Sequence, residues 1–258
     1  MQETDLELLI RAASASGEIA KTFFNNAPKT WDKADGAGPV TEADLAVNAL
    51  LEEQLRSARP NYGWLSEEST DTQDRQKCEH VFIIDPIDGT RSFIEGSGTW
   101  AHSLAIARNG VITAAAVFLP MRDMFFTASI GQGAYMNGAP ISSSAAAGFE
   151  NSNILATRPS LEEQHWAENT PPVFKRHHRP SLAYRLSLVA KGSFDGMLTL
   201  RPSWEWDIAA GALIVSEAGG AITDKTGAPL MFNNTDPRLN GVVAAAPALH
   251  SALVSRLA

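Results

Sequence analysis

Two aspartates at the end of one apolar segment are the first residues whose type and spacing could do chemistry. Residues 81–84 form a short β-branched-rich run, which is typical of a buried strand, and Asp85 and Asp88 follow it three positions apart. Gly89 permits a sharp turn, and Thr90 can cap a short helix whose free N–H groups favour an anion. Carboxylates for a cation thus lie beside an anion-binding turn, which indicates a site for a metal-bound phosphate. The alternative is a surface turn, because Asp-Pro and Asp-Gly pairs often mark turns.

Other acidic residues stand where separate elements are predicted to end or begin. Glu67 and Glu68 follow a predicted strand over residues 62–65, which repeats the arrangement before Asp85, although adjacent glutamates are usually a solvated turn. Asp207 opens a predicted helix beside two tryptophans, where it could also be an ordinary acidic N-cap. Like charges about 4 Å apart repel by roughly 4 kcal/mol at an effective dielectric constant of 20. Four converging carboxylates would therefore require cations or protons.

Asp44 is a further acid with two possible roles. It follows Thr41 by three residues, which predicts a capping box at the start of a helix over residues 42–56. The cap alone is sufficient to explain this residue.

The hydrophobic pattern predicts a mixed set of helices and strands that must position these acids. Asn-Gly pairs at 109–110 and 137–138 indicate tight hairpins, and the Gly-, Pro- and charge-rich residues 31–39 are predicted to be a mobile loop. The predicted helices span residues 6–24, 42–56, 160–168, 181–191, 207–217 and 247–257. The predicted strands span residues 62–65, 81–84, 102–108, 111–119, 124–129, 134–136, 154–157, 197–200, 221–224 and 241–246. This order favours two sheets with helices between and outside them over an alternating parallel barrel.

Composition and charge exclude several classes of protein. The chain has 258 residues with 44% hydrophobic and 19% charged content, which are ordinary globular values. A net charge of −8 argues against binding a nucleic-acid polymer, and no apolar run approaches the roughly 18 residues that span a membrane. The acidic amino terminus is unlike a secretory signal, so a cytoplasmic location is expected. The lone Cys78 cannot form an internal disulfide, and the motifs of P-loops, serine hydrolases, zincins and dinucleotide sites do not occur.

Three separated blocks carry a resemblance to a known family. They are Trp64-Leu65-Ser66-Glu67-Glu68-Ser69, Asp85-Pro86-Ile87-Asp88-Gly89-Thr90 and Trp206-Asp207-Ile208-Ala209-Ala210-Gly211. In order and spacing, over essentially the whole chain, the sequence resembles the inositol monophosphatase superfamily of magnesium-dependent, lithium-sensitive phosphatases. The resemblance implies a layered αβαβα sandwich with two mixed β-sheets, like inositol monophosphatase and fructose-1,6-bisphosphatase. It implies a single phosphatase domain over 1–258 with two packed lobes, of which about 1–140 carries the metal site and about 141–258 contributes Asp207.

The resemblance also implies a set of metal ligands. Glu67, Asp85 and the carbonyl of Ile87 would bind one Mg²⁺, and Asp85 would bridge to a second ion that Asp88 and Asp207 complete. A third, weaker ion would lie near Glu67, and Li⁺ would inhibit. Hard oxygen ligands of this kind suit Mg²⁺.

The catalytic roles implied by the resemblance fall on residues close to these ligands. In the family a water activated by the metal is polarised by a threonine–aspartate pair, here Thr90 and Asp44, with Glu67 close by. The backbone N–H groups of Gly89 and Thr90 would hold the phosphoryl oxygens. Lys33 matches a family lysine near the third metal and is predicted to help close the site, unless it is a solvated loop residue.

The sequence departs from the inositol-specific pattern in ways that concern the substrate. Those members carry an acid seven residues before the last metal aspartate, where this chain has Leu200. Arg91 follows Thr90, and Glu205 precedes Trp206, and both features resemble the bacterial branch that removes the 3'-phosphate from 3'-phosphoadenosine 5'-phosphate. The preferred prediction is therefore a 3'(2'),5'-bisphosphate nucleotidase with Arg91 and Glu205 among its substrate contacts.

The most basic segment of the chain, residues 175–185, is the candidate for the rest of such a substrate. Arg185 suits a distal phosphate, and Tyr184 could stack on a base, although a solvated loop and helix face would have the same composition. An inositol-1-monophosphatase or another small sugar phosphatase is the alternative activity. A non-catalytic metal- or phosphate-binding protein is the alternative class. The expected partner is a small phosphorylated metabolite, with no nucleic-acid polymer or membrane, and the family is often dimeric.

Overall fold

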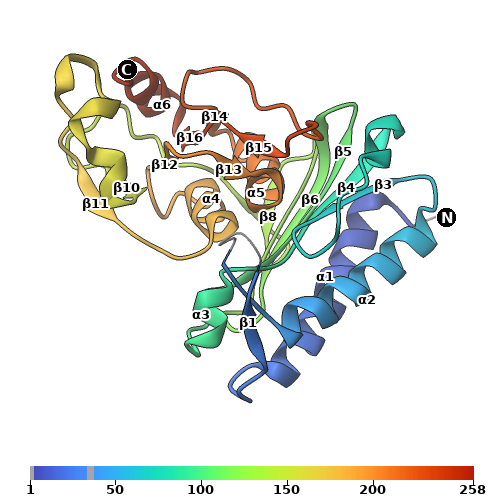
Figure 1. The fold of residues 1–258 in the computed structure, drawn as a ribbon. Coiled ribbons are helices and arrows are strands. Elements are labelled where there is room, and N and C mark those ends of the chain that lie inside the picture. The colour runs from blue at the N-terminus through green and yellow to red at the C-terminus, as the bar shows by residue number, and fades with distance from the viewer. Residues whose placement is uncertain (1–2, 34–37) are drawn as a thin grey trace.

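The protein forms five layers in the order helix, sheet, helix, sheet, helix (Figure 1). The computed structural model describes residues 3–33 and 38–258. The helices of the layers are α1 (Asp5–Phe23), α2 (Glu42–Ala58), α4 (Leu182–Ala190), α5 (Glu205–Glu217) and α6 (Pro247–Val254). The pair α1 and α2 covers one face of the larger sheet, α4 and α5 lie between the two sheets, and α6 lies on the far face of the smaller sheet. The layered αβαβα fold that the sequence predicts is confirmed.

The larger sheet has seven strands in the order β3-β4-β5-β6-β7-β8-β9. Only β3 and β4 run parallel, and the remaining neighbours are antiparallel. The strands are β3 (Gly63–Ser66), β4 (His80–Asp88), β5 (Ala101–Arg108), β6 (Val111–Leu119), β7 (Met124–Ser129), β8 (Ala134–Met136) and β9 (Ala139–Ile141). Both Asn-Gly hairpins are confirmed as two-residue turns, because Arg108 pairs with Val111 and Met136 pairs with Ala139.

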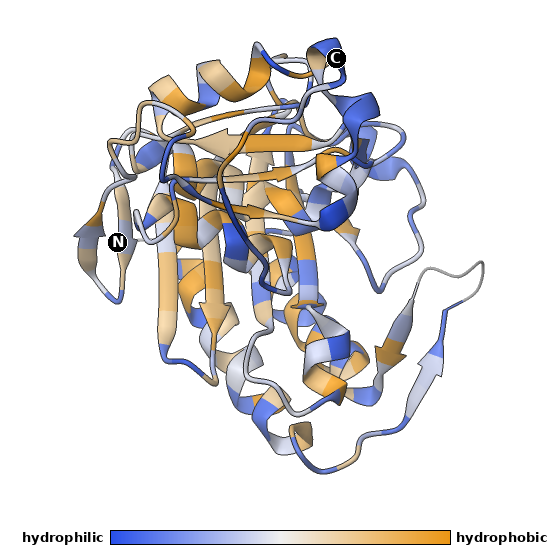
Figure 2. Cartoon of the chain, turned by 90° about the vertical axis from the view of Figure 1, so that its left-hand side faces the viewer, coloured by the Kyte–Doolittle hydropathy of each residue, from blue (hydrophilic) through white to orange (hydrophobic). Residues whose placement is uncertain are grey.

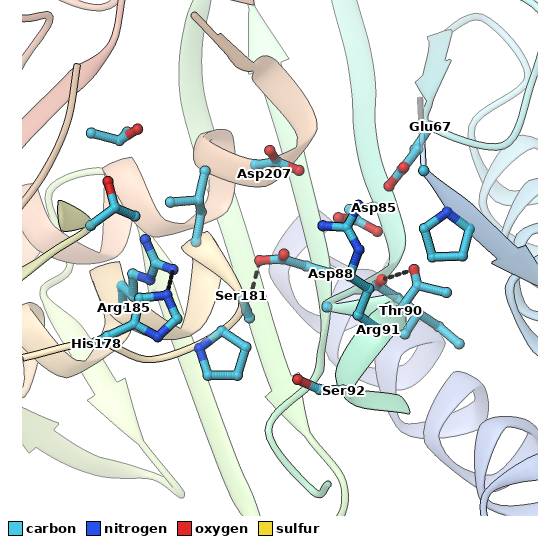
Figure 3. A pocket seen from close by; sticks show the side chains of 18 of the residues that line it. Glu67, Asp85, Asp88, Thr90, Arg91, Ser92, His178, Ser181, Arg185 and Asp207 are labelled. Atoms are coloured by element: carbon cyan, nitrogen blue, oxygen red, sulfur yellow. Dashed lines mark hydrogen bonds between the residues drawn. The ribbon is translucent and has the colours of Figure 1, made fainter. Parts of the chain in front are cut away.

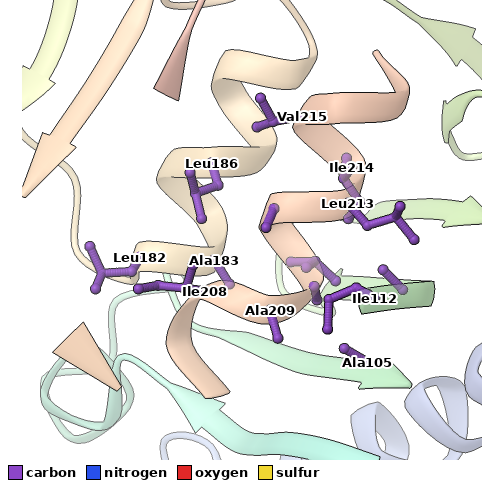
Figure 4. Packing of buried hydrophobic residues seen from close by; sticks show 14 of the residues in the cluster. Ala105, Ile112, Leu182, Ala183, Leu186, Ile208, Ala209, Leu213, Ile214 and Val215 are labelled. Atoms are coloured by element: carbon purple, nitrogen blue, oxygen red, sulfur yellow. The ribbon is translucent and has the colours of Figure 1, made fainter. Parts of the chain in front are cut away.

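The larger sheet is buried on both faces, which explains the continuous apolar run in β4. Phe82 and Ile84 belong to the core shared with α1 and α2, whereas Val81 and Ile83 belong to the core shared with α4 and α5. In that second core Leu186 of α4 lies beside α5 (Figure 4). A Cβ added at Gly211 of α5 would stand 2.6 Å from Cβ of Leu186. The small residues in α5 therefore permit close helix packing.

The smaller sheet has five strands in the order β11-β10-β12-β16-β14. They are β10 (Asn153–Ala156), β11 (Lys175–His177), β12 (Gly196–Thr199), β14 (Ala221–Thr223) and β16 (Val242–Ala245). Its outer face packs on α6 through buried residues such as Leu198 and Leu249. Hydrophobic residues concentrate in the strands and in the helices that face them, and the connecting segments are mainly hydrophilic (Figure 2). No helix in the described ranges is both long and apolar enough to cross a membrane.

Two predicted segments differ from the structure. The predicted loop over residues 31–39 is wrong at both ends, because β1 (Thr30–Asp32) and β2 (Pro39–Thr41) pair antiparallel, and residues 34–37 lie outside the described part. The predicted helix over residues 160–168 is also wrong. Three short 3₁₀ turns replace it, because Glu162 and Trp166 adopt extended backbone conformations. These turns are η3 (Arg158–Leu161), η4 (Glu163–His165) and η5 (Ala167–Asn169).

The remaining short elements complete the chain. They are the 3₁₀ turn η2 (Asp74–Lys77), the helix α3 (Thr90–Ile94) and the two-stranded ribbon of β13 (Ser203–Trp204) and β15 (Arg238–Leu239).

Candidate active site

Three carboxylates from three separate elements converge at one edge of the larger sheet. The parallel strands β3 and β4 end at the same edge, where Glu67 N donates to the Ile84 carbonyl at 3.2 Å and brings the Glu67 side chain toward Asp85. Asp207 reaches the same point from the first turn of α5 (Figure 3). One carboxylate oxygen each of Glu67, Asp85 and Asp207 lies within 4.8 Å of the other two.

The electrostatics of this trio fit a divalent cation. Asp85 is almost fully buried, and its Oδ1 has no hydrogen-bond partner among the residues the structure describes. Burial, reinforced by the charges of Glu67 and Asp88, raises the pKa of Asp85 well above its ordinary value. Burial and the neighbouring carboxylates raise the pKa of Asp207 in the same way. An unpartnered buried carboxylate among like charges needs a counter-ion or a proton, and the oxygen donors suit Mg²⁺.

Asp88 contributes to the site while it also holds α4. Strand β4 extends four residues past the predicted end, and a bulge between Asp85 and Asp88 turns both side chains toward the cavity. The Oδ2 atom of Asp88 accepts hydrogen bonds from Ser181 Oγ and Ala183 N, both at 2.7 Å. Burial raises the pKa of Asp88 to about 6, although these hydrogen bonds oppose the shift. Its Oδ1 atom is the one that remains for a metal.

The structure brings Thr90 and Asp44 together, although 46 positions separate them. Thr90 Oγ1 lies 3.1 Å from Asp44 Oδ1 and 3.2 Å from the Ile87 carbonyl. Asp44 Oδ2 meanwhile accepts from Thr41 N and Thr41 Oγ1, so the predicted capping box is present as well. Burial raises the pKa of Asp44 to about 6.

The turn before Thr90 depends on a glycine. Gly89, with φ of +104°, is the N-cap of α3, whereas the sequence predicted Thr90 in that role. An added Cβ would meet Thr99 and Trp100 backbone atoms at 3.4 Å.

Lys33 lies beside the carboxylates from the end of β1. Its Nζ is 2.6 Å from Glu67 Oε1 and 2.6 Å from Glu68 Oε1. Burial raises the pKa of Glu68 to about 7, and the hydrogen bond from Lys33 works against that shift. The lysine therefore compensates charge at the edge of the cluster where the third ion is predicted.

A cavity of about 410 Å³ opens on these residues, and Arg185 and His178 lie across it from Asp85 (Figure 3). Burial and the neighbouring arginines lower the pKa of His178, so Arg185 carries the positive charge of this pair. Gly89, Thr90 and Arg91 line the cavity, and so do His178, Arg185 and Arg201. Arg185 is mostly buried, with Nη2 3.0 Å from His178 Nε2. His178 and Arg201 were not singled out from the sequence. The only signals were the basic character of residues 175–185 and the position of Arg201 beside Leu200.

Two predicted substrate contacts are corrected by the structure, since neither side chain lines the cavity formed by the described residues. Tyr184 of α4 is buried in the hydrophobic core between the two sheets. The guanidinium carbon of Arg122 lies 5.7 Å from the centroid of the Tyr184 ring. Glu205 is fully buried and accepts hydrogen bonds from Asn233 N at 2.6 Å and from Asn234 N at 2.8 Å. Tyr184 cannot stack on a ligand in this position, and both Glu205 oxygens already have partners.

The layered fold, with three converging carboxylates beside the Gly89 turn, fits a metal-dependent phosphatase. A model of the inositol monophosphatase family matches residues 1–258. The inositol-1-monophosphatase of Rhizobium meliloti (strain 1021) is 32% identical over 237 residues, which cover 86% of each chain. The Nus factor SuhB of Escherichia coli (strain K12) is 33% identical over 235 residues, which cover 86% of this chain and 85% of that one. The chain belongs to the inositol monophosphatase family, a family of phosphatases whose members generally depend on Mg²⁺.

Solved structures of relatives share the whole fold. The extragenic suppressor protein suhB of Bartonella henselae is 29% identical, covers 96% of both chains and superimposes with a TM-score of 0.81. An IMPase of Thermotoga maritima is 26% identical, covers 97% of this chain and 95% of its own, and has a TM-score of 0.82.

Proposed function

We propose that the protein is a Mg²⁺-dependent phosphomonoesterase that acts on a small metabolite with a second anionic group. The preferred substrate is a 3'(2'),5'-bisphosphate nucleotide such as 3'-phosphoadenosine 5'-phosphate, from which the 3'-phosphate is removed. The observation that carries this proposal is the polarity of the cavity. Carboxylates that can bind a metal line the same cavity as Arg185 and Arg201, and Arg185 lies across it from Asp85 (Figure 3).

The residues around the carboxylates can divide the catalytic work among them. Glu67, Asp85, the Ile87 carbonyl, Asp88 and Asp207 would hold two Mg²⁺ ions, with room for a third near Glu67. Bound Mg²⁺ supplies Lewis-acid chemistry, since it lowers the pKa of a water and neutralises charge on the phosphoryl group.

The attacking water is positioned by Thr90 and Asp44 in this proposal. Ionised Asp44 accepts the hydroxyl hydrogen of Thr90, so the Thr90 oxygen is free to accept a hydrogen bond from the water. The backbone N–H groups of Gly89 and Thr90 bind the phosphoryl oxygens as negative charge develops on them. A non-catalytic binding protein would not need the Thr90–Asp44 pair, which favours an enzyme.

The arginines that line the cavity support a substrate with a second charge. A guanidinium forms two parallel hydrogen bonds with a phosphate, and Arg201 and Arg91 present such groups to the cavity. Inositol 1-phosphate has hydroxyl groups in place of a second phosphate. Inositol-specific members have an acid where this chain has the buried Leu200, so that partner for a hydroxyl group is missing. Inositol 1-phosphate remains the second candidate, because a relative 32% identical is named inositol-1-monophosphatase.

A comparison of substrates tests the proposal. Phosphate release with Mg²⁺ is measured from 3'-phosphoadenosine 5'-phosphate, inositol 1-phosphate and p-nitrophenyl phosphate, with and without Li⁺. We expect the highest kcat/KM for the bisphosphate and inhibition by Li⁺. Faster turnover of inositol 1-phosphate would reverse the order of the two candidates, and absence of release from every ester would refute the phosphomonoesterase.

The proposal includes a cytoplasmic enzyme that forms a homodimer and has no nucleic-acid polymer or membrane as partner. Size-exclusion chromatography with light scattering measures the oligomeric state.

A further inference from the structure

Strand β5 contributes no predicted metal ligand, yet two of its residues contact both segments that carry the carboxylates. His102 Nδ1 lies 2.5 Å from the carbonyl oxygen of Pro86, between Asp85 and Asp88. Ser103 Oγ donates to the carbonyl of Trp206, directly before Asp207, at 2.9 Å. Neither His102 nor Ser103 has any exposed surface. Neither of them lines the cavity that the described residues form around the carboxylates.

His102 faces the bulge that brings Asp85 and Asp88 to the same side. Asp85 pairs with Ser103 and Asp88 pairs with Ala101, so two residues of β4 oppose the single residue His102. A bulge interrupts the regular hydrogen bonds of the ladder, and the His102 ring supplies a bond to the Pro86 carbonyl.

The hydrogen-bonding state of His102 follows from its surroundings. A carbonyl can only accept, so Nδ1 must carry the hydrogen. Burial lowers the pKa of His102 to about 4, which keeps the ring neutral. Its Nε2 has no partner among the described residues, and Trp100 packs edge-on at 5.4 Å between ring centroids. The buried, unpartnered Nε2 lowers stability, and an apolar side chain at this position would not have that penalty.

Ser103 connects two layers of the fold. Its side chain points from the larger sheet to α5, whereas His102 points to the face that α1 and α2 cover. The bond to Trp206 fixes the beginning of α5 relative to β5, one residue before Asp207. Adjacent residues of one strand therefore hydrogen-bond to the backbone beside Asp85 and Asp88 and to the backbone before Asp207.

We propose that His102 and Ser103 are positioning residues that hold Asp85, Asp88 and Asp207 in the arrangement that binds Mg²⁺. This inference rests on the proposed function in so far as these three acids are the metal ligands. Groups that orient metal ligands from outside the coordination sphere commonly change metal affinity by about 10–100-fold when they are removed.

The test compares paired substitutions at each position. His102→Leu removes the donor at similar size, and His102→Asn keeps an amide donor near the position of Nδ1. Ser103→Ala removes the hydroxyl. Ser16→Ala is its matched control, because Ser16 is equally buried and donates to the Ala12 carbonyl at 2.9 Å within α1. Mg²⁺ affinity is measured by isothermal titration calorimetry, the melting temperature by calorimetry, and KM at saturating Mg²⁺ by phosphate release.

We expect His102→Leu and Ser103→Ala to weaken Mg²⁺ binding by about 10–100-fold, with KM at saturating Mg²⁺ unchanged. His102→Asn and Ser16→Ala should bind Mg²⁺ as the unaltered protein does. Equal Mg²⁺ affinity in Ser103→Ala and Ser16→Ala, with similar losses of melting temperature, would overturn the proposal even if His102→Leu failed to fold. A protein that binds Mg²⁺ but hydrolyses no ester refutes the proposed function alone, since calorimetry still decides the positioning role.

Discussion

The two sides of the cavity are built in different ways. Among the residues that line it, we call Glu67, Asp85, Asp88 and Asp207 the acidic wall, and His178, Arg185 and Arg201 the basic wall. Asp85 and Asp88 lie in the last residues of β4, Glu67 directly follows β3, and Asp207 lies in the first turn of α5, so sheet or helix hydrogen bonds hold the backbone at each acid. The basic wall consists of α4 and of loop residues beside it.

This difference separates chemistry from selectivity. The acidic wall concentrates like charges in a buried place, so its geometry is useful only with bound cations. In the proposed function the basic wall would face the part of the substrate that does not react, where charge changes affinity more than the rate of the chemical step. Changes to the acidic wall should therefore affect any phosphate ester, and changes to the basic wall should affect only some.

Asp85→Asn should produce the largest effect, because Asp85 is the acid that both predicted ions share. We expect kcat/KM to fall by about 10²–10³-fold for bisphosphate and simple esters alike. The melting temperature of the metal-free protein should rise, since one of the repelling buried charges is gone. Asp74→Asn, at an exposed acid, is the control and should change neither quantity. Retention of activity by Asp85→Asn would refute the assigned site.

Mg²⁺ should stabilise the protein in a pH-dependent way. The pKa values of Asp44 and Asp88 in the folded state are about 6, above the usual 3.8, so the folded protein holds these protons more tightly. Their contribution to the free energy of unfolding is complete below about pH 4 and is lost as pH rises through about 6. The metal-free melting temperature should decrease across this range.

The increase caused by Mg²⁺ should accordingly be larger at pH 7.5 than at pH 5. At a hundredfold excess over Kd, binding adds about 2.7 kcal/mol to the free energy of unfolding, or roughly 5–10 °C in Tm. Scanning calorimetry with Mg²⁺ or with EDTA measures both trends. An equal increase at the two pH values would show that protons and Mg²⁺ do not compete for the acidic wall.

Thr90→Ala should lower kcat by about 10–100-fold with little change in KM, because the water loses a positioning partner while the metal ligands remain. Thr90→Ser keeps the hydroxyl and should retain most of the rate. Asp44→Asn should resemble Thr90→Ala, and the double variant should be no worse than either single change. Steady-state kinetics at saturating Mg²⁺ decide this, and full additivity would contradict a joint role.

Arg201→Gln should give the smallest and most selective effect. We expect about a tenfold increase in KM for 3'-phosphoadenosine 5'-phosphate, equivalent to about 1.4 kcal/mol, with p-nitrophenyl phosphate unaffected. Arg238→Gln is the control, since that exposed arginine pairs with Asp236 and lies over Trp204. An equal effect of Arg201→Gln on both esters would assign Arg201 to the acidic wall and remove the distinction between the two sides.

The parts of the fold that the sequence predicted correctly are those that a few neighbouring residues specify. The Asn-Gly hairpins require positive φ at both turn residues, and the capping box at Thr41 lies within four residues. The 3₁₀ turns at 158–169 and the strand β11 were missed. The turns have no sustained period, and β11 is defined only by pairing with β10.

The candidate site divides in the same way. Tyr184 and Glu205 lie in helical segments whose residue types suit a ligand, but packing turned both into the interior. His178 and Arg201 carried no recognisable motif, and they meet only because α4 and the end of β12 lie at the same cavity. Side-chain direction on a helix depends on its neighbours, which a local pattern does not contain.

By itself the sequence determined the layered fold class and the acids of the predicted metal site, because strand ends, turns and caps are encoded by neighbouring residues. Only the tertiary structure decided that Thr90 meets Asp44, that Asp88 also caps α4, and that a basic wall faces the acids. The physical reason is distance along the chain. Contacts across 46 or more positions arise when whole layers pack, and packing depends on the shapes of all the buried side chains together.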